Sequence, residues 1–250
     1  MDKEVNSGAG LNLAEVKFRG LLNKQNMDLW NELNREYTIE LDEGPEEGYL
    51  TYFNDEVVVI EVDMANISPA AFTHELLHVY LKARGVQIIW DLKEIINGDN
   101  DLGEVISTSL RVHMGNCLEH VKMLPIFLSL GFRNEDFILD YKKKILDEEQ
   151  MLDLKRAFRQ NSQAGLGMVD KYIGKFFAMK ASNNPDFDYS LLYEQMEELD
   201  CSLYRLNQNF WDAWGRYEIG EPKEKYISFL SDYLDGLKSW KKAFSIDEGL

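Results

Sequence analysis

The sequence of residues 71–78 is Ala-Phe-Thr-His-Glu-Leu-Leu-His, and it contains the pattern His-Glu-x-x-His. Its surroundings predict a helix. Ser68 can cap the N-terminus of that helix, and Pro69 suits the first helical position, where a backbone N–H would have no partner. Gly85 is typical of the residue that follows the end of a helix. We therefore expect one helix that begins near Pro69 and ends before Gly85.

His74 and His78 are four residues apart, so on this helix their imidazoles lie side by side on one face. Glu75 is displaced by about 100° around the axis and can reach a water molecule next to a metal. The opposite face is apolar and can be buried: Phe72, Leu76, Val79 and Ala83. This arrangement predicts a Zn²⁺ site with His74 and His78 as ligands and Glu75 as the base.

The alternative is an ordinary helix with two histidines at the edge of the core. The distribution of histidine argues against it, since the chain has only 4 histidines and all lie between His74 and His120. The predicted helix is also capped at both ends and amphipathic around the motif. We therefore prefer the metal site.

The bulk composition limits the class of protein. A chain of 250 residues with 45% hydrophobic residues is one large domain or two small ones, with a substantial core. The net charge of −17 repels phosphate backbones, so we expect no nucleic-acid partner. Two cysteines do not form a disulfide framework. The N-terminus lacks a signal-peptide pattern and no apolar run could span a bilayer, so we expect a cytoplasmic protein without a membrane partner.

Strand signals are confined to the N-terminal third. Residues 37–41, 49–53 and 56–62 are rich in strand-forming residues, and turn signals separate them at residues 42–48 and 54–55. They predict a small antiparallel three-stranded sheet, arranged as a meander, that leads into the motif helix. A helical segment over residues 11–36 precedes the sheet.

The rest of the chain has helical periodicity. We expect a helix over residues 86–96, a long helix over residues 103–124 that is kinked or ended by Pro125, and helices throughout the chain after Gly131. Two apolar stripes with 3/4 spacing, over residues 192–214 and 226–244, are typical of core. The expected fold class is α+β, with a core domain over residues 1–131. A helical region over residues 132–250 would pack on or extend that core, and could bind a protein partner.

A catalytic zinc ion needs one more protein ligand. The candidates share the predicted helix over residues 103–124. Glu119 lies away from the apolar stripe of that helix, and a carboxylate in an apolar helix needs a compensating partner such as a metal. His120 would give three imidazole ligands instead, and His113 is a weaker candidate. We favour Glu119, with His120 as the alternative.

The order of sheet, His-Glu-x-x-His helix and later ligand helix resembles the zincin metallopeptidases. The metzincin branch does not fit, because Leu81 stands at its glycine position and Arg84 at its final histidine position. The segment around Glu119, 41 residues beyond His78, resembles the third-ligand helix of gluzincins. The stretch from Val57 to Leu81 also resembles small intracellular gluzincins of bacteria and phages, although Leu77 replaces a glycine that is common there. The resemblance covers residues 37–124.

The resemblance implies a zinc-dependent metallopeptidase acting on a peptide or protein substrate. Glu75 would be the general base, His120 or His113 could stabilise the oxyanion, and the strand over residues 56–62, if it lies at the sheet edge, could pair with an extended substrate. Two alternatives stay open. One is a non-catalytic helical interaction protein with a structural or relic zinc site, and the other is a zinc hydrolase of a non-peptide amide.

Overall fold

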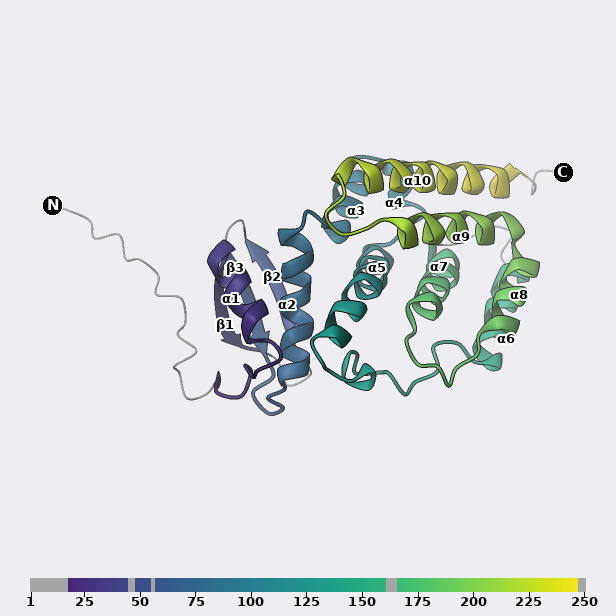
Figure 1. Cartoon of the computed structure of the whole chain (residues 1–250). Coiled ribbons are helices and arrows are strands. Elements are labelled where there is room, and N and C mark those ends of the chain that lie inside the picture. Colours follow the sequence, from purple (N-terminus) through teal and green to yellow (C-terminus); the bar gives the residue numbers. More distant parts are fainter. Residues whose placement is uncertain (1–17, 45–47, 55–56, 161–165, 247–250) are drawn as a thin grey trace. The chain divides into compact units, whose positions relative to one another are not determined.

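The computed structural model describes residues 18–44, 48–54, 57–160 and 166–246. They form an α+β fold in which helices dominate the C-terminal half, as predicted (Figure 1). The chain divides into two compact units that are interleaved in sequence. The first unit comprises Met1–Ala83 and Met123–Leu139, and the second comprises Arg84–Lys122 and Asp140–Leu250. The predicted pair of domains meeting at residue 131 stays a prediction.

The first unit is built on a three-stranded sheet with the strand order β1-β3-β2. Strand β3 pairs in parallel with β1 and antiparallel with β2. The predicted strands are confirmed, but the antiparallel meander is wrong, and so is the edge position of β3. The apolar strand β3, with Val58, Ile60 and Val62 buried, lies in the centre of the sheet. The elements are β1 (Thr38–Glu43), β2 (Leu50–Asn54) and β3 (Val57–Val62).

Two helices, α1 (Met27–Glu36) and α2 (Pro69–Ala83), contact each other and the sheet (Figure 1). The rings of Trp30 on α1 and Phe72 on α2 lie 5.8 Å apart, and both side chains are buried. Burial of such side chains is the main source of stability of a small α+β unit. It also holds α2 in a defined rotation about its axis.

The ends of α2 are as the sequence predicts. The side-chain oxygen of Ser68 accepts a hydrogen bond from the Ala71 N–H at 3.2 Å, which satisfies one of the unpaired donors of the first turn. Gly85 follows the helix with φ of +79°, a conformation that favours glycine. Both predicted signals are therefore confirmed, and they set the length of the helix that carries the motif.

Asn26 anchors the first turn of α2 to the preceding chain. Its amide group is fully buried; it donates to the Leu21 carbonyl at 2.9 Å and to the Thr73 hydroxyl at 3.0 Å. Its carbonyl oxygen accepts from the Asn23 N–H at 2.8 Å. Since Thr73 precedes His74, these bonds help to place the histidine-bearing face of α2.

We expect Asn26→Ala to lower the free energy of unfolding by about 2–4 kcal/mol, because it leaves several buried polar groups without a partner. Chemical denaturation followed by circular dichroism measures this. Asn34→Ala, at an exposed position of α1, is the matched control and should change stability by less than about 0.5 kcal/mol. Equal effects of the two substitutions would show that Asn26 is not an anchor.

The described residues of the second unit form helices and connecting loops, and no described residue after Val62 forms a strand, as predicted. The prediction of helices throughout the chain after Gly131 is wrong for residues 137–147, which form turns and bends. Pro125 lies inside α5, which continues to Ser129, so the predicted kink or break does not end the helix. The apolar stripe over residues 192–214, which we expected to lie on one helix, spans two, because Asp200 caps α9 by accepting from the Leu203 N–H at 2.8 Å. The helices are α3 (Ile88–Asn97), α4 (Asn100–Gly103), α5 (Thr108–Ser129), α6 (Glu148–Gln160), α7 (Leu166–Ala181), α8 (Ser190–Leu199), α9 (Cys201–Arg216) and α10 (Lys223–Ile246), and the short 3₁₀ helix η2 (Asn134–Asp136) lies in the first unit.

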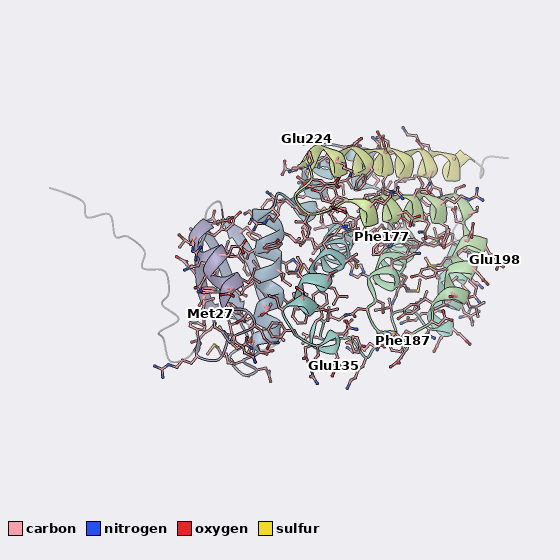
Figure 2. The ribbon with its side chains drawn as sticks, in the orientation of Figure 1. Met27, Glu135, Phe177, Phe187, Glu198 and Glu224 are labelled. Carbon is pink, nitrogen blue, oxygen red and sulfur yellow. The ribbon has the colours of Figure 1, made fainter. Side chains whose placement is uncertain are left out.

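Aromatic residues fill the core of the second unit, which confirms the interpretation of the two apolar stripes. Phe177 on α7, labelled in Figure 2, lies 5.9 Å from the ring of Phe210 on α9. Phe210 in turn stacks on Tyr233 of α10 at 4.5 Å. Trp214 is fully buried, and its indole N–H donates to the Leu118 carbonyl of α5 at 2.9 Å. These contacts fix α5, α7, α9 and α10 as one packed group.

No described helix combines the length and the apolar composition that crossing a bilayer requires.

Candidate metal centre

Helix α2 places His74 and His78 side by side, as their spacing predicts. The centroids of the two rings lie 5.1 Å apart, and the rings meet edge to face. His74 also packs against the buried ring of Phe137 at 4.8 Å, within the first unit. Both imidazoles are half-buried, while Leu76 and Leu77 between them are fully buried. The helix is therefore held by its apolar residues with one imidazole face turned to a common site.

Glu75 is 9% exposed, which is unusual for a carboxylate. One of its oxygens, Oε2, accepts a hydrogen bond of 2.7 Å from the hydroxyl of Thr51 on β2. A hydrogen bond to an ionised carboxylate compensates part of the cost of its burial and fixes its orientation. The sheet therefore holds the side chain that the motif predicts as a general base.

Thr51 is a site residue that sequence analysis missed. It lies in β2, where positions alternate in burial, and its side chain is on the same face as that of Phe53. The alternation in the sequence shows that Thr51 and Phe53 share one face of β2. Only the pairing of β2 with β3 places that face against α2. The sequence feature that could have identified Thr51 is its hydroxyl, which stands at a position of the strand where an apolar side chain would be expected.

The third histidine of the group is His120. One ligand nitrogen from each of His74, His78 and His120 lies within 4.8 Å of the others, and all three residues are half-buried. His120 is on α5, one turn before Met123, where this helix continues into the first unit. Among the described residues, these three form a group with the composition of a metal site.

Glu119, the predicted third ligand, is 6% exposed on α5 but is not among the side chains of this group. Its assignment as a ligand stays a prediction, and the geometry favours His120. His113 does not belong to the group either. Its Nε2 atom lies 3.1 Å from the Gly174 carbonyl oxygen in the second unit.

The composition of this group suits a metal ion such as zinc. Zinc binds imidazole nitrogen at about 2.0–2.1 Å in tetrahedral geometry, so nitrogens on one ion lie about 3.4 Å apart. The nitrogens of this group lie within 4.8 Å of one another, so they would have to move closer together to share one ion. Three histidines leave the fourth position for water, which is the arrangement of catalytic sites.

Cys117, on the same helix as His120, does not suit a thiolate ligand. Burial raises the pKa of its thiol to about 12, and the charge of Asp140 acts in the same direction. A thiol with this pKa stays protonated at neutral pH, and the thiolate is the form that binds metals. The group of three histidines accordingly contains no sulfur donor.

The chain matches no protein-family model, no curated protein and no solved structure. Its function is therefore inferred from its own side chains: three imidazoles and one buried carboxylate held by a threonine.

Proposed function

We propose that the chain is a zinc-dependent metallopeptidase in which His74, His78 and His120 bind the metal and Glu75 is the general base. The observation that carries this proposal is Glu75 itself. It stands beside two imidazoles on one helix, nearly buried, and it is oriented by the hydroxyl of Thr51.

These residues divide the chemistry between them. Zinc, when bound, lowers the pKa of a water molecule and polarises a carbonyl group. Glu75 accepts the proton of the attacking water at its carboxylate and later delivers it to the nitrogen of the leaving amine. Thr51 keeps the carboxylate in one orientation during both transfers. The packing around α2 holds the imidazoles in place.

The structure supports a catalytic site more than a structural one. A purely structural zinc site needs no base and more often contains cysteines. Burying Glu75 lowers stability unless its partners compensate for the lost hydration, so its place beside the histidines is most simply explained by its use. The non-catalytic interaction protein is therefore the weaker alternative.

The sheet supports an extended peptide as the substrate. β3 is central, so it cannot accept a further strand, contrary to our expectation from the sequence. β2 lies at the sheet edge, and its Thr51 contacts Glu75. An extended peptide that added to β2 would lie next to the base, which favours a peptide over a small non-peptide amide.

The first test is the metal content. We expect the purified protein to contain about one equivalent of zinc, as a mononuclear site implies, and His74→Ala to remove it. Mass spectrometry of the metal after extensive dialysis measures this. The matched control is His113→Ala, because His113 contacts Gly174 and lies outside the group.

Full zinc occupancy of the His74→Ala protein would contradict the assignment. Circular dichroism of both variants shows that the loss of metal does not result from unfolding.

A further inference from the structure

The second unit contains an open, solvent-accessible cavity of about 390 Å³ that plays no part in the proposed metallopeptidase. Its walls come from α5, α7, the first turn of α6 and the segment before α6. The volume falls in the range of about 300–1,000 Å³ that small-molecule sites occupy. All of its described lining residues belong to this one unit.

The residues that line the cavity carry a net positive charge, whereas the chain as a whole is negative. The whole chain has 44 acidic residues against 27 lysines and arginines. The charged residues that line the cavity are instead mostly basic: Lys143, Lys144, Lys171, Lys175, Asp140 and Asp170. One oxygen of Asp170 accepts a hydrogen bond from the Ser107 N–H at 3.3 Å, which partly satisfies this carboxylate. The cavity is therefore a local positive region in an acidic protein.

In the part of the chain that the structure describes, the lysines of the cavity form no close ion pair, although the charge of Asp147 acts on Lys175. Among the described residues, no carboxylate forms an ion pair with Lys143, Lys144 or Lys171. The ammonium group of Lys175 donates to two neutral acceptors, the Ile145 carbonyl and the Gln150 side chain. Lys143, Lys144 and Lys171 are exposed to solvent, so their ammonium groups are accessible to a dissolved anion.

Two of these lysines also repel each other. Lys171 and Lys175 are four residues apart on α7, so both ammonium groups lie on one face of the helix, which is unfavourable for like charges. Burial lowers the pKa of Lys175, Asp147 opposes this shift, and the charge of Lys171 adds to it. An anion placed among these lysines would relieve the repulsion.

We propose that this cavity binds a compact anion that carries two or more phosphate groups. Lysine ammonium groups are point charges that suit phosphate oxygens, whereas planar carboxylates are bound best by arginine, which is absent from the described lining. Apart from the imidazole of His113, the described lining contains no aromatic ring that could stack on a nucleobase. His113 lies at the wall, with its Nε2 atom directed to the Gly174 carbonyl.

Isothermal titration of the full chain with pyrophosphate tests the proposal. We expect saturable binding at one site in low salt, and binding about tenfold weaker in the double variant Lys143→Gln/Lys171→Gln, because two favourable charge interactions are lost. The matched control is Lys93→Gln/Lys242→Gln, which removes the same charge from the same unit outside the cavity. The control should bind within about twofold of the unmodified chain.

Equal weakening in both double variants, or no saturable binding to the unmodified chain, would overturn the proposal. Citrate binding as tightly as pyrophosphate would overturn the assignment to phosphate. Chelation of zinc by pyrophosphate affects both variants alike, so the difference between them reports the cavity alone. Thermal melts test whether both double variants are folded. If Lys143→Gln/Lys171→Gln does not fold, the single variant Lys144→Gln, at an exposed lysine of the cavity, replaces it.

Discussion

Glu75→Gln is expected to keep zinc bound and to lower peptide hydrolysis by about 10²–10⁴-fold, the range for removal of a general base. The amide has nearly the shape of the carboxylate, so the histidines on α2 should keep their positions, but it cannot accept the proton of the attacking water. Cleavage of a mixed peptide library, followed by mass spectrometry, supplies a substrate and then the rate. Zinc content is measured on the same samples.

Substitutions of Thr51 should have a smaller effect of the same kind as Glu75→Gln. Thr51→Val removes the hydroxyl that holds Glu75, and we expect kcat to fall about tenfold with little change in KM, since the positioning residue acts through the base. Thr51→Ser keeps the hydroxyl and should restore most of the rate. Unchanged turnover in Glu75→Gln would mean that Glu75 is not the base. A loss of rate in Thr51→Ser as large as in Thr51→Val would exclude the positioning role.

The second large effect concerns the third ligand. His120→Ala is expected to weaken zinc binding by more than about 100-fold. Removing a residue that only hydrogen-bonds to a metal ligand already lowers metal affinity by about 10–100-fold, and removing a ligand itself should cost more. Glu119→Gln, at the neighbouring position of α5, should weaken it by no more than about tenfold. A competition titration with a chromophoric chelator measures both affinities.

The opposite result would restore the prediction made from the sequence. If Glu119→Gln releases the metal and His120→Ala retains it, the site has two histidines and one glutamate as ligands. The absorption spectrum of the cobalt-substituted protein provides an independent check, because it responds to the exchange of an imidazole for a carboxylate.

The motif helix could be predicted from the sequence because its determinants are local. Ser68 caps α2 within three residues, and Gly85 follows its end in a positive-φ conformation. His74 and His78 lie side by side because residues four apart in a helix share one face. The existence of three strands and of the later helices also follows from residue type and periodicity over a few residues.

Features that join distant segments were decided by the tertiary structure. Alternation in β1 and β3 indicates strands, but it does not show that the two pair in parallel, because pairing depends on how the chain between them crosses over. For the same reason the predicted edge strand is the central one, and β2 brings Thr51 to Glu75.

The choice between Glu119 and His120 as the third ligand also depends on the tertiary structure. They are adjacent on α5, about 100° apart around its axis, so only the rotation of that helix against its neighbours selects which side chain approaches the motif. The structure places His120, and not Glu119, in the group with His74 and His78. Local sequence determined the positions of His74, Glu75 and His78 on one helix. The proposed third ligand lies on another helix that begins 30 residues after His78, so its place in the group is a long-range property.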